Sequence, residues 1–466
     1  MTSDHFSDDG RDNEFDPARD IEEILRGMLS GQNFDGFGID PSELAKAAGL
    51  PLDQAALQQM LGALQHAMTP QAMSGETDWS LARKTAIDVA SKDGNPSTRS
   101  LQSAFSTASL WLDSATTMGA SADAPRELQR IEWVQQTIDT WIEMAEPVAD
   151  SISQALTSAM QEQLPEEFQS AVSQASGMLK GVGAALFAMQ LGQVVGSLAR
   201  EVVSGGDVGV PLLGGPGKEG GALLPENVAA FAKGLDQETT EVELFLATRE
   251  LAHSRLFRHA RWLRSHLMSA VGEYARGIEI NVEHIEDLAI DLDPHNPEQI
   301  QEILRSGQLI PPKTERQQAA HERLETMIAL VDGYVDVVTL EATKLLPGAT
   351  ALAEMIRRRR AAGGPAERAF ATLVGLELRP RKLREAAALW QLVGEKGGIE
   401  TRDGLWAHPD FLPTIEELEN PELLLKRIGL VPHEADPAEI DFDRELKRLL
   451  EEGNLGDQGT GETPES

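Results

Sequence analysis

The chain has no cysteine among its 466 residues. This absence excludes disulfide bonds, zinc sites built on thiolates and cysteine nucleophiles together. The side chains left for a metal site are therefore histidines and carboxylates.

Positive charge is also scarce. The chain has 41 Lys and Arg against 75 Asp and Glu, a formal net charge of −34. An open nucleic-acid-binding surface is excluded because it would repel phosphates. The first twenty residues are acidic and lack the apolar core of a signal peptide. We therefore expect a cytoplasmic protein whose partner is a peptide or a small molecule, with no nucleic acid and no membrane involved.

Signals for β-strands are few. The chain has two tyrosines, few alternating runs of β-branched residues and no hairpin turn between apolar runs. Hydrophobic residues make up 41% of the chain, which is enough for a sizeable core. These features predict a mainly α protein with little or no sheet.

One nearly uncharged stretch must be considered as a candidate membrane span. Gly181–Ala199 contains Gly192-x-x-x-Gly196, a spacing at which membrane helices pack closely. Gln190 and Gln193 interrupt the stretch, and most of its residues are small rather than large and apolar. The pattern favours a buried, closely packed core helix over a membrane span.

Composition divides the chain into four parts. Residues 1–18 and 452–466 are polar and acidic, which predicts disordered tails. Between them we expect an N-terminal helical region over 19–160 and a helical core over 165–450. Residues 204–225 hold enough glycine and proline to end any regular element, so they are expected to form a loop.

The sequence from Arg249 to His253 is an HExxH pattern with arginine in its first position. In an intact motif, two histidines one helical turn apart bind Zn²⁺, and the glutamate between them activates the metal-bound water. Glu250 and His253 are present here. Arginine stays protonated and offers only donors, so Arg249 cannot ligate a metal.

A helix over 240–258 is expected to carry this motif. Thr240 and Glu243 have the spacing of a capping box, which would begin the helix. On such a helix the arginine, glutamate and histidine of the motif project from one side.

A second helix is expected over 322–345. Its apolar residues form one stripe at helical spacing: Leu324, Met327, Ile328, Val331, Val335 and Val338. Asp332 and Asp336 lie one turn apart beside this stripe. They are either ligands that face the motif or a solvated edge of the helix.

Other ligand sets are compatible with the spacing. His259 follows His253 by six residues, as in metzincins, although a leucine replaces the glycine that those enzymes use to turn the chain. The Glu-x-x-His element also occurs in dimetal bundles, but we find no second copy. His253 and His259 with a carboxylate from Asp332 or Asp336 remain an alternative set.

Four blocks of the sequence resemble a bacterial family of zincin-like, zinc-dependent metalloproteases or hydrolases. The first three are FLATRELAHSRLFRHARWLRSHL, EYARGIEINVEHIEDL and RLETMIALVDGYVDVVTLEATKLLP, and the fourth begins GGPAERAFATLVGLELRPRKLREAAALW. The resemblance covers roughly residues 170–425. The resemblance implies a zincin-like fold, zinc as cofactor, Glu250 as general base and His253 as second ligand. The third-ligand glutamate corresponds to Asp332, which is one methylene shorter. Some family members also carry the arginine form of the motif.

Two functions follow. The first is a zinc-dependent, peptidase-like hydrolase in which Glu250 activates water and His253 holds the metal with a downstream carboxylate. The second is a catalytically inactive zincin-fold binding or regulatory protein. In that case Arg249 would pair with a carboxylate such as Asp332 and fill the position of the metal. Such a cationic pocket would suit an acidic peptide or a small anion.

Two basic islands interrupt the acidic sequence, at Arg357–Arg360 and Arg379–Arg384. Solvated helix ends or intramolecular partners among the excess acidic residues are favoured over an acidic ligand.

Overall fold

The described residues of the computed structural model lie within Ala67–His284 and Pro311–Ser466. Both expected tails and the first part of the expected N-terminal helical region lie outside the described residues. The structure describes residues 77–92, 99–162, 169–213, 219–277, 313–364, 367–369, 371, 382–431 and 448.

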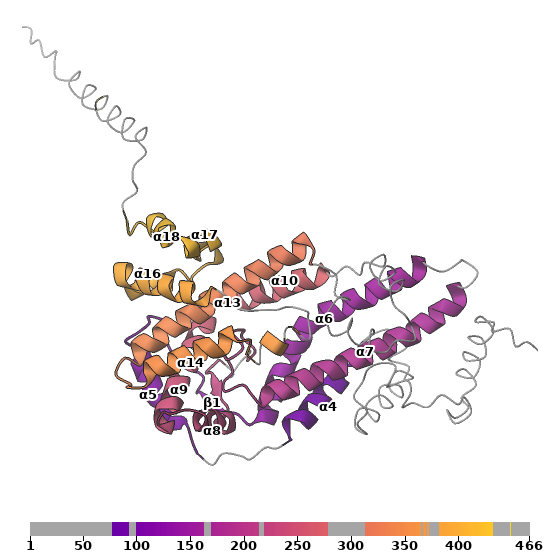
Figure 1. The fold of residues 1–466 in the computed structure, drawn as a ribbon, viewed down its shortest axis with the longest axis horizontal. Coiled ribbons are helices and arrows are strands. Elements are labelled where there is room, and N and C mark those ends of the chain that lie inside the picture. The colour runs from indigo at the N-terminus through magenta and orange to yellow at the C-terminus, as the bar shows by residue number, and fades with distance from the viewer. Residues whose placement is uncertain are drawn as a thin grey trace, which may run out of the picture. The chain divides into compact units, whose positions relative to one another are not determined.

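Helices account for nearly all regular structure in these ranges, which confirms the prediction of a mainly α protein (Figure 1). The two strands β1 (Arg126–Glu127) and β2 (Ala222–Leu223) pair in parallel. The helices are α4 (Trp79–Ala90), α5 (Gln102–Leu112), α6 (Arg130–Glu162), α7 (Gln169–Ala199), α8 (Pro225–Lys233), α9 (Thr239–His259), α10 (Trp262–Arg276), α13 (Glu315–Ala342), α14 (Ala349–Ala361), α16 (Leu383–Gly404), α17 (Ile415–Glu419) and α18 (Pro421–Arg427), with a 3₁₀ turn at Pro409–Phe411.

Helix α13 contacts α5, α9, α10, α14 and α16. It begins after Thr314, whose hydroxyl accepts from the Gln317 amide while the Gln317 side chain accepts from the Thr314 amide. The apolar stripe predicted for this helix is buried throughout. Since so many elements pack on α13, its side chains are held in fixed positions from several directions.

A buried polar network fastens α13 to α16. The Asp403 carboxylate accepts from the Tyr334 hydroxyl at 2.8 Å and from Arg402 Nε at 3.0 Å. It also accepts from the Thr116 hydroxyl and the Thr117 amide, both at 2.7 Å, in the segment after α5. Buried polar groups cost free energy unless they are paired, so this satisfied set specifies one packing of the three segments.

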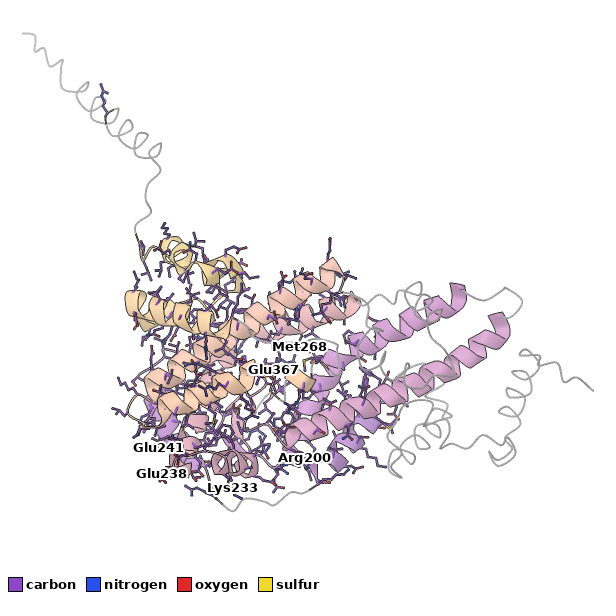
Figure 2. All side chains as sticks on the ribbon, viewed as in Figure 1. Arg200, Lys233, Glu238, Glu241, Met268 and Glu367 are labelled. Carbon is purple, nitrogen blue, oxygen red and sulfur yellow. The ribbon has the colours of Figure 1, made fainter. Side chains whose placement is uncertain are left out.

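The capping box expected at Thr240 and Glu243 is wrong. Helix α9 begins one residue earlier, with Glu238 (labelled in Figure 2) at the N-cap and no side-chain hydrogen bond to close the first turn. Arg99 binds both residues instead. Its Nε lies 2.6 Å from a Glu243 carboxylate oxygen, and its Nη2 lies 3.4 Å from the Thr240 hydroxyl. A tertiary contact has replaced the local one.

Helix α7 packs against α4 and α6 (Figure 1). Gly192 and Gly196 lie where α4 crosses: a Cβ atom added at Gly192 would be 2.5 Å from the Ala82 carbonyl oxygen, and one added at Gly196 would be 2.6 Å from that of Ala86. The small residues of the uncharged stretch therefore serve contact between two helices of this chain. Within the described ranges, no helix is long and apolar enough to cross a membrane.

Replacing Gly192 by alanine should destabilise the protein by about 1–3 kcal/mol, because the new methyl group meets backbone that cannot move aside. Gly183→Ala in the same helix is the matched control. A Cβ atom there meets no described atom within 4 Å, so the change should be neutral or stabilising by up to about 1 kcal/mol through helix propensity. Urea unfolding measures both. Equal stability of the two variants would contradict the close contact.

Candidate functional site

The motif residues and the two aspartates lie together in the interior. Arg249, Glu250 and His253 are all buried on α9. Asp332 and Asp336 on α13 are only 1% and 3% exposed, so neither forms a solvated edge of its helix. The two helices are in contact. Arg249 and His253 face Asp332, as expected, whereas Glu250 binds the glycine-rich loop instead.

The Asp332 carboxylate lies between two guanidinium groups. Arg249 Nη2 is 3.2 Å from its Oδ1 atom. Arg360 approaches the other oxygen, with Nε at 3.0 Å from Oδ2 and Nη2 in contact with the same atom. Burial acts to raise the pKa of Asp332, but Arg360, His253 and Arg249 together hold the pKa below its usual range. This aspartate therefore stays ionised at neutral pH.

Arg360 comes from the first basic island, on α14. Its Nη1 atom also lies 2.7 Å from Glu367 (labelled in Figure 2) and 3.3 Å from the Asp207 carbonyl oxygen. Three residues earlier on α14, Arg357 binds Asp336 with Nε at 2.9 Å and Nη2 at 2.5 Å. The prediction of intramolecular partners is thus confirmed for these arginines. The sequence did not reveal that one partner would be the counterpart of a metal ligand.

His253 is enclosed between the two helices. Its Nδ1 atom lies 3.2 Å from the Arg249 carbonyl oxygen, and its Nε2 atom lies 3.7 Å from Asp332 Oδ1. Nε2 is buried and has no hydrogen-bond partner among the described residues. Burial lowers the pKa of His253, and the cations of Arg249 and Arg360 lower it further while Asp332 opposes them. The imidazole is neutral at neutral pH.

Glu250 holds the glycine-rich segment against α9. Its Oε2 atom accepts the Gly206 N–H and its Oε1 atom accepts the Ala222 N–H, each at 2.8 Å. Burial raises the pKa of Glu250 to about 7, although these amide donors act to lower it. Both oxygens are committed to backbone, so the carboxylate joins the two ends of the loop.

Glycines let this loop approach the site. A Cβ atom at Gly206 would be 2.8 Å from His253 Cγ, and one at Gly209 would be 2.7 Å from Arg360 Nη2. Gly209 also has a φ of +74°, which glycine adopts without strain. The glycines and prolines of 204–225 predicted only a connecting loop, and this contact with the site was not predicted. The number of glycines in 204–225 was a signal for this role. A loop needs glycines where its backbone must pass close to other side chains.

The remaining candidates do not join the cluster. His259 is exposed at the last position of α9. Asp336 is buried but engaged by Arg357. Across the ranges that the structure describes, no three His, Asp or Glu side chains are placed to hold a metal ion.

The zinc implied by the family resemblance does not fit these residues. A zinc site takes three or four ligands from the protein. Here the first position is Arg249, and both oxygens of Asp332 are bound by arginines. His253 Nε2 is the one uncommitted ligand atom of the three positions. The arrangement is a cation–anion–cation cluster in place of a metal site.

A pocket of about 170 Å³ opens on the other side of Glu250 and His253. Its walls are partly apolar, from Leu212, Leu213 and Phe257, and partly backbone of the glycine-rich loop. Its lining also includes arginines from the end of α9 and the start of α10. The site can therefore receive a small group without a metal to bind it.

Comparison with known proteins agrees with this architecture. A family model described as zincin-like metallopeptidase matches residues 77–425. A crystal structure from Chloroflexus aurantiacus, described as a "putative hydrolase with a novel fold", is similar with a TM-score of 0.52 and 18% sequence identity; the likeness covers 77% of this chain and all of that one. At this identity the likeness concerns the fold alone. None of the curated proteins matches the chain.

Replacing Asp332 by asparagine should destabilise the protein by about 3–5 kcal/mol, because Arg249 and Arg360 would be buried without their shared carboxylate. Asp336→Asn is the control on the next turn of α13. Its partner Arg357 is partly exposed and can be solvated, and burial already raises the pKa of Asp336, so the loss should be about 1 kcal/mol. Chemical unfolding measures the loss of unfolding free energy in both variants. Equal losses would contradict the central role of Asp332.

Proposed function

Because the chain belongs to the zincin-like metallopeptidase family, we propose that it keeps the family scaffold around a metal-free ion cluster and acts as a binding protein. The site that carries a metal in a zinc peptidase would here be filled by arginine. The pocket in front of it would receive a ligand that is held but not hydrolysed. Its location in the cytoplasm stays a prediction.

The observation that carries this proposal is the double engagement of Asp332. Arg249 and Arg360 bind its two oxygens from two different helices. A divalent ion about 5 Å from either guanidinium would be repelled by about 7 kcal/mol at an effective dielectric constant of about 20. Structural zinc sites with a full ligand set gain about 10–16 kcal/mol. One histidine and a shared aspartate cannot supply that gain. The arginines should therefore stay bound to Asp332 and exclude zinc.

Glu250 would also prepare the pocket for binding. Glu250 fixes the glycine-rich loop through Gly206 and Ala222, so the wall of the pocket is set before a ligand arrives. A site that is rigid in advance loses less entropy on binding. In this proposal Glu250 is a positioning residue, and neutral His253 forms part of the pocket floor.

A peptidase-like hydrolase is the second candidate. Family membership favours it, as does the pKa of Glu250, which at about 7 suits a general base. Against it, both oxygens of Glu250 already accept backbone N–H groups, and no Lewis acid fits beside it. We rank it below the binding function for these reasons.

Zinc content tests the proposal. Protein purified without a His tag and without added metal should contain almost no zinc by mass spectrometry, and a chelator should leave its melting temperature unchanged. The Arg249→Gln variant should also contain almost no zinc, because the substitution adds no side chain that can ligate a metal. Stoichiometric zinc in the wild-type protein, lost together with stability on chelation, would overturn the metal-free proposal and favour the hydrolase.

The same measurement on variants separates the two arginines. Arg249→His combined with Arg360→Gln supplies a second imidazole and frees Asp332, so zinc content should rise toward one ion per chain. Arg249→His with Arg357→Gln is the matched control, because Arg357 binds Asp336 instead, and its zinc content should stay well below that level. Equal zinc in both double variants would show that Arg360 does not block the site.

A further inference from the structure

Three arginines line the pocket at three-residue spacing. Arg258 lies near the end of α9, Arg261 lies between the two helices, and Arg264 is on the first turn of α10. They gather in a chain whose formal net charge is −34. A cationic rim on so acidic a protein calls for a physical explanation, because most of the arginines that the structure describes are paired with carboxylates of the same chain.

The three arginines differ in how strongly other groups of the chain bind them. Arg264 is paired with Glu143 at 2.5 Å. Arg258 has weaker contacts, with Nη1 at 3.4 Å from the Gly119 carbonyl oxygen and Nε at 3.9 Å from Glu219. Arg261 is exposed and makes no ion pair with any residue that the structure describes. One guanidinium at the rim is thus uncommitted and a second is loosely held.

Two acidic residues line the same pocket and must be weighed. Both oxygens of Glu250 are engaged by backbone N–H groups, and its pKa is raised, which reduces its negative charge at neutral pH. Glu219 is partly exposed and lies beside Arg258. Glu143, outside the pocket lining, already compensates Arg264. The positive charge of the rim therefore rests on Arg261, with Arg258 only loosely compensated by Glu219.

The shape of the pocket limits the ligand. Its volume of about 170 Å³ is below the range of about 300–1,000 Å³ that accommodates a drug-sized molecule. It therefore fits the end of a chain better than a length of chain. Leu212, Leu213 and Phe257 provide an apolar wall for a side chain, beside the arginines that would meet an anion.

We propose that this pocket binds a carboxylate carried next to an apolar group, as at the C-terminus of a peptide that ends in an aliphatic residue. Arg261, with Arg258, would bind the carboxylate in the planar geometry that suits guanidinium groups. The acidic surface elsewhere would not prevent this, because its field is screened beyond about 8–10 Å at physiological salt. The inference rests on the proposed binding function and names the ligand class of that same site.

Calorimetric titration of the full chain, in buffer containing EDTA, tests the inference with three short peptides. The first ends in leucine with a free carboxylate, the second is its C-terminal amide, and the third is an amide whose last residue is glutamate. The free acid should bind at least tenfold more tightly than its amide. Binding of the third peptide in place of the first would assign the carboxylate to a side chain and overturn the terminal assignment.

Variants locate the interaction. Arg261→Gln should weaken binding of the free acid about fivefold and leave the amide unchanged, and adding Arg258→Gln should weaken it further. Arg316→Gln on α13 is the control: it removes the same charge from an exposed residue that does not line the pocket, and it should have no effect. Equal losses from Arg261→Gln and Arg316→Gln would indicate a long-range charge effect and overturn the site.

The outcomes separate this inference from the proposed function. Failure of the metal-free protein to bind the free acid, or equal binding of acid and amide, overturns the carboxylate pocket while the metal-free cluster stands. Binding of the acid that appears only when zinc replaces the chelator would overturn the arginine site and contradict the metal-free proposal as well, because a bound zinc ion would then hold the carboxylate.

Discussion

The structure depends on one buried carboxylate that must stay charged. Asp332 is enclosed on α13, and isolating an ionised carboxylate in a protein interior costs many kilocalories per mole. Two guanidinium groups compensate it, one from α9 and one from α14. Glu367 then balances the second of them, so charge alternates through the cluster. Three helices are held together because each supplies a charge that the others need.

In the proposed metal-free protein, this cluster would take over the structural role of the metal. A zinc ion in a zincin neutralises carboxylate charge and ties separate helices together. Arg249 and Arg360 achieve both effects with donors alone, but a guanidinium is not a Lewis acid and cannot generate a nucleophile from water. Glu250 is consistent with the same change of role, because its oxygens bind the backbone of Gly206 and Ala222. The chain belongs to the family and, in the proposed function, its charged site residues serve packing in place of metal binding.

Local patterns in the sequence predicted the two helices of the site and the residues on them that pair with each other. Periodicity placed the motif and Asp332 on two helices, and the chemistry of arginine predicted the pair between Arg249 and Asp332. Asp332 was singled out by the family resemblance, and the other contacts between distant segments could not be predicted from local patterns. Arg360 reaches Asp332 because α14 folds back over α13, and the loop at 204–225 reaches the motif through glycine backbone. The prediction of a capping box was wrong for the same reason, because Glu243 binds the distant Arg99 in place of the helix N-terminus.

Crystals of the wild-type protein soaked in zinc, with diffraction recorded at the zinc absorption edge, test the central claim most directly. The account predicts the Arg249 and Arg360 guanidinium groups on the two oxygens of Asp332, and no anomalous peak beside His253. A peak about 2.0–2.2 Å from His253 Nε2 and from an Asp332 oxygen, with the arginines displaced, would contradict it.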